Sequence, residues 1–259
     1  MAVWKDFALT HTGNVRNNNE DAFACHPELG LWLVADGMGG HEAGEVASAI
    51  AIETIVEQVR QGRDLTDAIL AAHHNILSSS HTERGAKGMG TTVVALQTQG
   101  ARYRVAWVGD SRAYLWTKTS ENTGILEQLT TDHSYVQMLV AAGTISMQEA
   151  LSHKDKNVIT QCLGSMDNEQ IRVDTVEREW QANQWILLCS DGLSDELSFE
   201  KISARLNSQH DIETAARELL DETLAQGGRD NATIVLVGKN QTASHKLLDR
   251  FHQWLSSKH

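Results

Sequence analysis

Three short apolar runs along the chain each end close to an aspartate. The runs cover residues 31–35, 105–108 and 185–189, and Asp36, Asp110 and Asp191 follow them. Each run has the length of a β-strand and lacks strict alternation of apolar and polar positions, which is typical of strands buried on both faces. The same reasoning predicts further strands at 91–96, 114–116 and 233–237.

Helical spacing of apolar residues appears between these strands. Residues 42–60 carry an apolar stripe, a second helix is predicted over 65–77 after an Asp64 cap, and a third spans about 211–225 before Gly227. The second helix is expected to turn Leu65, Ala68, Ile69, Ala72, Ile76 and Leu77 inward. Because strands outnumber helices and short turns join several neighbours, we predict an α+β fold of mainly antiparallel sheets covered by helices.

Composition narrows the class of protein. The 259 residues contain a single proline, no internal repeat array and a net charge of -12, which disfavours nucleic-acid binding. Three separated cysteines form no CxxC pair, as expected for reduced thiols. No signal-peptide pattern and no apolar run of roughly 18 residues is present, so we expect a cytoplasmic protein without a membrane partner. The twelve histidines lie in no zinc-ligand spacing and are expected mostly on the surface.

Acidic residues stand at the ends of several predicted strands. A lone Asp-Gly is most often a turn, and an acidic excess is most often a solvated surface. Here Glu20 and Asp21 near the start, and Asp230 before the last strand, join the three strand-ending aspartates. If loops at strand ends bring them to one cleft, their charges repel unless cations neutralise them. Carboxylate ligands without Cys or His clusters favour Mg²⁺ or Mn²⁺, and two such ions roughly 4 Å apart suit phosphoryl transfer.

Several ordered segments resemble the bacterial metal-dependent PPM, or PP2C-type, Ser/Thr phosphatases. Each segment is weak alone, but their order is specific, and the resemblance spans about residues 6–238. The segments are Gly13-Asn14-Val15-Arg16, Asn19-Glu20-Asp21, Val34-Ala35-Asp36-Gly37-Met38-Gly39-Gly40-His41, Gly88-Met89-Gly90-Thr91-Thr92, Val108-Gly109-Asp110-Ser111-Arg112, Leu129-Thr130-Thr131-Asp132-His133-Ser134, Cys189-Ser190-Asp191-Gly192-Leu193 and Gly228-Arg229-Asp230-Asn231.

The resemblance implies a fold and a set of site residues. It implies an αββα sandwich in which Asp36 bridges two metals, the Gly37 carbonyl binds one, and Asp191 and Asp230 bind the other. Glu20 and Asp21 would be ligands or would hold metal-bound waters, and Asp110 would help to hold a third, weaker ion. Arg16 would bind the substrate phosphate through its planar guanidinium. We interpret Ser111 and Ser190 as turn formers because neither lies in a GxSxG motif.

The implied reaction is hydrolysis of phosphoserine and phosphothreonine by in-line attack of a metal-bridged hydroxide. The sequence departs from the eukaryotic pattern at Met38, where that pattern has a histidine proposed as the general acid. His41 or a metal-bound water could donate the proton instead, although a histidine at a helix start is commonly a capping or surface residue.

The same resemblance divides the chain into a phosphatase domain, 1–238, and a tail. Residues 132–164 correspond to the flap of bacterial members and would either recognise the phosphoprotein substrate or serve as a structural insert. The tail, 239–259, has a short amphipathic helix that would dock on the domain or on a partner. The expected partners are phosphoproteins, including a cognate Ser/Thr kinase, and the expected oligomeric state is a monomer.

Two other functions use the same features. A metal-dependent hydrolase of nucleotides or nucleic acid would use these carboxylates, but the net charge and the lack of a basic, aromatic-lined groove disfavour it. A catalytically silent phosphoprotein-binding module would be expected to lack metal ligands or Arg16, and all of these are present.

Overall fold

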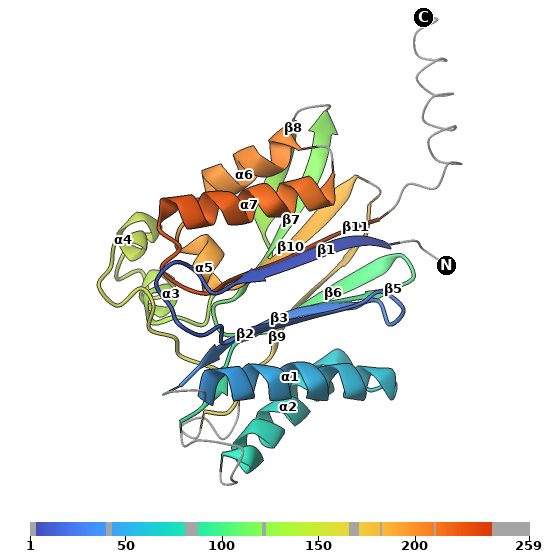
Figure 1. Cartoon of the computed structure of the whole chain (residues 1–259), viewed down its shortest axis with the longest axis vertical. Helices are drawn as coiled ribbons and strands as arrows, with labels where there is room; N and C mark the ends of the chain where they lie inside the picture. The colour runs from blue at the N-terminus through green and yellow to red at the C-terminus, as the bar shows by residue number, and fades with distance from the viewer. Residues whose placement is uncertain are drawn as a thin grey trace, which may run out of the picture.

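Two antiparallel sheets stack face to face in the computed structural model, and helices cover both outer faces (Figure 1). The structure describes residues 4–39, 43–80, 88–120, 123–165, 171–181, 183–209 and 211–239. His41 and the tail helix predicted after residue 239 lie outside these ranges. This architecture confirms the α+β sandwich expected from the sequence, and none of the described helices is long and apolar enough to cross a membrane.

The first sheet has the order β1-β11-β10-β7-β8, and all its pairings are antiparallel. Its strands are β1 (Trp4–His11), β7 (Arg112–Ser120), β8 (Thr123–Gln128), β10 (Gln184–Cys189) and β11 (Ala232–Lys239). Helices α6 (Phe199–Ser208) and α7 (Ile212–Gln226) cover its outer face, and the single turn α5 (Asp191–Ser194) follows β10 directly (Figure 1).

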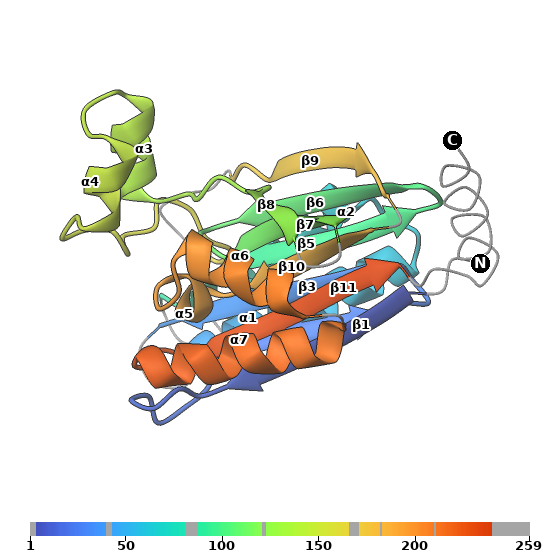
Figure 2. The same ribbon diagram turned by 90° about the horizontal axis from the view of Figure 1, so that it is seen from above.

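The second sheet has the order β2-β3-β5-β6-β9, with β4 paired to the far end of β3. Its strands are β2 (Asp21–His26), β3 (Leu31–Met38), β4 (Gly90–Thr91), β5 (Val93–Gln99), β6 (Arg102–Val108) and β9 (Asp174–Glu179). Helices α1 (Ala43–Arg60) and α2 (Leu65–Ser79) cover its outer face. The helices α3 (Tyr135–Ala141) and α4 (Met147–Leu151) project beyond one end of the sheets (Figure 2).

The lack of alternation in the apolar runs follows from this layering. In β3, Leu31 and Leu33 pack under α1 and α2, while Trp32 and Val34 face the opposite sheet. In β10, Ile186 and Leu188 enter the layer between the sheets, and their neighbours pack beneath α6 and α7. Both faces of these strands are buried, as predicted.

Several elements depart from the sequence prediction. The pattern did not single out β1, β2, β8 or β9, whose burial is partial; β9, for example, is an edge strand of mostly charged residues. The expectation of surface histidines is wrong for His73, which is 1% exposed on α2, where its Nδ1 accepts a hydrogen bond from the Gly164 N–H at 3.1 Å. Leu77, expected to point inward, is only partly buried.

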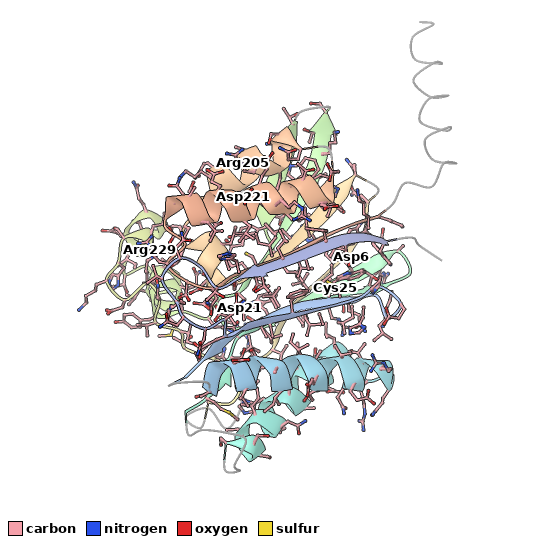
Figure 3. All side chains as sticks on the ribbon, viewed as in Figure 1. Asp6, Asp21, Cys25, Arg205, Asp221 and Arg229 are labelled. Carbon is pink, nitrogen blue, oxygen red and sulfur yellow. The ribbon has the colours of Figure 1, made fainter. Side chains whose placement is uncertain are left out.

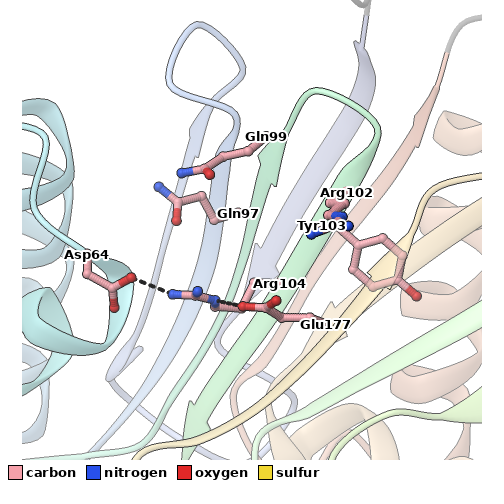
Figure 4. Close-up of a pocket in the computed structure, with 7 residues that line it drawn as sticks. All are labelled: Asp64, Gln97, Gln99, Arg102, Tyr103, Arg104 and Glu177. Carbon is pink, nitrogen blue, oxygen red and sulfur yellow. Dashed lines mark hydrogen bonds and ion pairs between the residues drawn. The ribbon is translucent and has the colours of Figure 1, made fainter.

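The start of α2 is tied to the edge of the second sheet. Asp64 caps the helix by accepting a hydrogen bond from the Thr66 N–H, as predicted. Its other carboxylate oxygen pairs with Arg104 of β6, which also pairs with Glu177 of β9, each at 2.5 Å (Figure 4). These partly exposed pairs line a polar cavity but contribute little to stability individually.

We predict that the layer between the sheets is the most mutation-sensitive part of the fold. Leu188→Ala removes a side chain that is 0% exposed, and should lower the free energy of unfolding by about 2–5 kcal/mol. Ile125→Ala, in the edge strand β8 where the side chain is 65% exposed, should change it by at most about 0.5 kcal/mol. Urea unfolding measures both, and equal losses in the two variants would contradict this description of the core.

Candidate metal centre

Acidic residues from separate segments meet at one end of the sandwich. Asp36, near the end of β3, pairs across the strands with Asp21, the first residue of β2. Asp110 follows β6, Asp191 opens α5 directly after β10, and Asp230 precedes β11. One cavity of about 310 Å³ is lined by seven predicted site residues, namely Arg16, Glu20, Asp36, Gly37, Asp110, Asp191 and Asp230, together with Met38, Gly39, Thr92, Asn157, Ile159 and Asn231.

Asp21 lies between the two sheets (Figure 3) and, unlike the other predicted carboxylates, is not among the residues that line this cavity. Its Oδ2 accepts hydrogen bonds from the hydroxyls of Ser190 and Thr233, each at 2.7 Å, whereas its buried Oδ1 has no partner. Burial raises the pKa of Asp21 to about 7, and the two hydroxyl donors oppose that rise. The carboxylate therefore keeps one oxygen able to accept a further bond.

Asp110, Asp191 and Asp36, which line the cavity, also hold their protons more tightly than usual. Burial raises the pKa of Asp110 to about 8 and that of Asp191 to about 6, and the charges of neighbouring carboxylates add to both effects. Burial likewise raises the pKa of Asp36 well above its ordinary value, followed by the charges of Asp21 and Asp191. Bringing these groups together therefore disfavours their ionised forms until a cation balances them.

Arg16 supplies a positive charge at the rim of the cavity. Its Nη2 lies 2.6 Å from Oδ2 of Asp230, and the Arg16 side chain is 52% exposed. Oδ1 of the same aspartate accepts a hydrogen bond from the backbone N–H of Asn231 at 2.8 Å. Asp230 is thus held in place from both sides, by an exposed guanidinium and by the strand that follows it.

Gly37 must be a glycine for a reason that the sequence did not reveal. A Cβ atom at this position would lie 2.1 Å from the carbonyl oxygen of Gly44 and 2.6 Å from that of Glu20. The Gly37 N–H donates to the Glu20 carbonyl at 3.1 Å. The end of β3 therefore packs directly against the backbone of α1, and this contact fixes the residue after Asp36.

Four residues to which the sequence analysis gave no part in the site organise the centre, namely Asn231, Ser190, Thr92 and Thr233. The Asn231 side chain accepts the Glu20 N–H and donates to the carbonyls of Thr12 and Asn18. The Thr92 N–H donates to the Asp36 carbonyl at 2.8 Å, and its hydroxyl accepts the Asp36 N–H at 3.2 Å. Polar residues directly beside the strand-end aspartates were the available signal for Asn231 and Ser190, and Thr92 lies in one of the segments that carry the family resemblance, but Thr233 had no such signal.

The interpretation of Ser190 as only a turn former is therefore wrong. Ser190 occupies the N-cap position of α5 but makes no side-chain cap. Its hydroxyl instead donates to Asp21 and accepts the Thr233 N–H at 3.0 Å. Ser111, the other serine interpreted in this way, hydrogen bonds through its hydroxyl to that of Thr92 at 2.7 Å.

The donor set fits hard divalent cations. The partnerless, buried oxygens Glu20 Oε1 and Asp21 Oδ1 can each accept a bond, and the remaining donors are carboxylates and a carbonyl, which suit Mg²⁺ and Mn²⁺. Within the described ranges, no three Asp, Glu, His or Cys side chains already form a metal-binding group. Two of the carboxylates engage protein partners instead: Asp230 pairs with Arg16, and Asp21 accepts from two hydroxyls.

Comparisons with known proteins agree with this geometry. A family model described as Protein phosphatase 2C matches residues 11–226. The Serine/threonine phosphatase stp of Listeria monocytogenes serotype 4b (strain F2365) is 33% identical over 246 residues, or 90% of this chain and 95% of the relative. The Serine/threonine protein phosphatase PstP of Mycobacterium tuberculosis (strain ATCC 25618 / H37Rv) is 37% identical over 235 residues, or 88% of this chain and 44% of that longer protein.

Solved structures give the same result. The crystal structure of the Mycobacterium tuberculosis serine/threonine phosphatase PstP/Ppp superposes with a TM-score of 0.82 at 35% identity, covering 92% of this chain and 99% of that one. A structure of the PstP catalytic domain in complex with 2 manganese ions gives a TM-score of 0.81 at 33% identity, covering 93% and 100%.

The raised pKa values predict an unusual pH dependence for the metal-free protein. Between the ordinary aspartate pKa of 3.8 and the value of about 8 at Asp110, the folded state binds more protons than the unfolded state. The free energy of unfolding should therefore fall as the pH rises through this window. In EDTA we expect Tm to be several degrees lower at pH 8 than at pH 5, since roughly 2–4 °C correspond to 1 kcal/mol in a domain of this size.

Scanning fluorimetry tests this expectation. Carboxylates with lowered pKa values, such as Asp174, affect stability only near and below an ordinary aspartate pKa. Burial lowers the pKa of His73, which opposes the trend below the ordinary histidine pKa of 6.5, so the fall in Tm should be clearest between pH 7 and 8. Mn²⁺ should raise Tm more at pH 8 than at pH 5, where protons compete for its ligands. Asp110→Asn should flatten the metal-free curve between pH 7 and 8. A metal-free Tm that rises steadily from pH 5 to 8 would contradict this account.

Proposed function

The chain belongs to the protein phosphatase 2C family and is a protein serine/threonine phosphatase, and from this premise we propose how its residues divide the work. It acts on phosphoproteins. The observation that carries the proposal is that carboxylates from five separate segments of the chain line one cavity, with the Arg16 guanidinium at its rim.

Asp36 and the Gly37 carbonyl, together with Asp191 and Asp230, are the proposed ligands of two divalent ions, Mn²⁺ or Mg²⁺. When bound, such ions supply a water nucleophile of lowered pKa and balance the charge on the phosphoryl oxygens. Glu20 and Asp21, each with a buried oxygen that lacks a partner, would position water around them. Asp110 is the proposed ligand of a third, weaker ion. The relative solved with two manganese ions supports the choice of metal.

Arg16 is the proposed binding residue for the substrate phosphate. Its guanidinium can hold two phosphate oxygens at once, and its ion pair with Asp230 keeps it at the mouth of the cavity. Since Asp230 also belongs to the proposed ligand set, one carboxylate links the phosphate-binding residue to the ions. The phosphorus atom would thereby be held above the carboxylates.

The departing serine or threonine oxygen requires a proton. Met38 lines the cavity but its thioether carries no proton to donate. His41, which lies outside the described residues, remains the proposed donor from the protein. The proposal therefore differs from the eukaryotic pattern at the general acid and not at the carboxylates.

The remaining assignments concern partners. Residues 132–164 are the proposed flap, because Asn157 and Ile159 of this segment line the catalytic cavity. We place the protein in the cytoplasm as a monomer, opposing a bacterial Ser/Thr kinase and acting on neither nucleic acid nor membranes. The similarity to phosphatases that are named for serine and threonine supports the choice of substrate.

Removing a ligand should abolish activity without unfolding the chain. Asp36→Asn and Asp191→Asn should each lower kcat on a phosphothreonine peptide with Mn²⁺ by at least about 10²-fold, the scale of a lost metal or oxyanion contact. Asp221→Asn, on the exposed face of α7, is the matched control and should retain full activity. Circular dichroism checks folding. Turnover that persists in both site variants, or in EDTA, would refute the proposal.

Arg16 variants should separate phosphate binding from metal binding. Arg16→Ala should raise KM for the phosphopeptide by roughly 10-fold or more, because a charge-assisted contact of about 1.5–3 kcal/mol is lost. Arg16→Lys keeps the charge but loses the bidentate geometry, so its KM should lie between the values for the wild type and for Arg16→Ala. The Mn²⁺ concentration for half-maximal activity should not rise in either variant, since Arg16→Ala removes a cation that competes for Asp230 and Arg16→Lys only replaces one cation with another. An unchanged KM in Arg16→Ala would exclude the phosphate role.

A further inference from the structure

One buried histidine lies directly behind the turn that carries Asp110. His133 is 9% exposed, and its Nδ1 accepts the backbone N–H of Gly109 at 3.1 Å. The backbone N–H of His133 donates in turn to the Gly109 carbonyl at 2.9 Å. Both polar groups of the Gly109 backbone are therefore held by a single residue.

The imidazole is itself fixed on two sides. Its Nε2 lies 3.3 Å from Oδ2 of Asp174, which also pairs with Arg172, and its ring stacks on Trp107 at 6.3 Å between centroids with an angle of 27°. Since Nδ1 accepts a hydrogen bond, Nε2 carries the proton and donates it to Asp174. This arrangement sets the tautomer and the orientation of the ring, as the outer partners of metal-site residues do.

The backbone of this turn is constrained by its neighbours. Gly109 has a φ of 108°, which favours glycine, and a Cβ there would lie 2.6 Å from Cβ of Thr92. Thr92 blocks the turn on one side, and His133 binds it on the other. Among the described residues, no side-chain donor binds the Asp110 carboxylate, so its position in the cavity depends on this backbone.

The same residue joins the segment proposed as the flap. The His133 carbonyl accepts the Thr160 N–H at 2.7 Å, and the Tyr135 N–H donates to the Val158 carbonyl at 2.8 Å. The first and second legs of the segment, residues 133–135 and 158–160, therefore meet here. Between them, α3 and α4 project beyond the sheets (Figure 2). Asn157 and Ile159, at the second leg, line the catalytic cavity.

From these contacts we propose that His133 is a positioning residue: its Nδ1 holds the Asp110 turn in register with the cavity, and its backbone carbonyl ties that turn to Thr160 in segment 132–164. The proposal rests on the assignment of Asp110 as a metal ligand. Loss of the Nδ1 acceptor would free the Gly109 N–H and displace Asp110, while Asp36 in β3 and Asp191 at the start of α5 would stay in place. The consequence is a weaker response to metal in a folded enzyme.

Two near-isosteric variants test the position of the acceptor. His133→Asn can place an amide oxygen where Nδ1 lies, whereas His133→Gln places its amide near Nε2 and leaves the Gly109 N–H without a partner. Mn²⁺ titrations followed by the rise in Tm and by phosphothreonine-peptide hydrolysis should each give a midpoint concentration about tenfold higher for His133→Gln, the lower end for loss of an outer partner of a metal ligand. For His133→Asn the shift should stay below about twofold.

Two controls make the test specific. His73→Gln removes a similar imidazole bond to a backbone N–H, at Gly164, and should lower Tm without shifting the Mn²⁺ response. In an Asp110→Ala background, His133→Gln should cause no further shift, because both changes would act through the same carboxylate.

Equal Mn²⁺ shifts in the Asn and Gln variants, an unmoved Mn²⁺ curve in His133→Gln, or additive effects with Asp110→Ala would overturn the proposal. Failure of the proposed function has a different signature. In that case the wild-type protein would need no Mn²⁺, or Asp36→Asn would remain active, and there would be no metal response for His133 to alter.

Discussion

Confinement of like charges is the constraint on which this structure depends. Asp21, Asp36, Asp110 and Asp191 are partly buried at one end of the sandwich, and burial raises the pKa of each. A fold that gathers such groups loses stability as they ionise, and recovers it only when a cation enters or a proton remains. The same arrangement therefore favours the binding of divalent ions and lowers the stability of the metal-free protein.

The arrangement persists because neutral donors and a packed core hold the carboxylates. Ser190 and Thr233 donate to Asp21, and Asn231 ties the Glu20 backbone to the loops before β2. Behind them, the layer between the sheets contains large side chains such as Trp32 and Leu188, with no exposed area. A densely packed layer of this kind resists collapse, so the carboxylates cannot relieve their repulsion by moving apart.

The sequence predicted those parts of the fold and site that leave a local signature. Strands buried on both faces read as unbroken apolar runs, and the strand-ending aspartates marked the cavity. Edge strands such as β9 were not predicted, because their partial burial leaves no clear apolar pattern in the sequence. The requirement for glycine at position 37 could not be deduced either, since it arises from Gly44 of α1, which meets it only after folding. Thr233 similarly reaches Asp21 across 212 positions of chain, a contact that no local window contains.

The way each carboxylate is anchored suggests a division within the centre. Asp36 lies in β3, and its carbonyl and N–H both bond to Thr92, so it moves only with the sheet. Asp191 opens α5 directly after a core strand. Asp110, in contrast, lies in a turn that one imidazole holds, and the backbone carbonyl of the same histidine accepts the Thr160 N–H of the projecting segment. A displacement of this segment can therefore move Asp110 without moving Asp36 or Asp191. With the ions held as proposed, such a centre would keep its two core metals while the proposed third position at Asp110 responds to whatever contacts the segment.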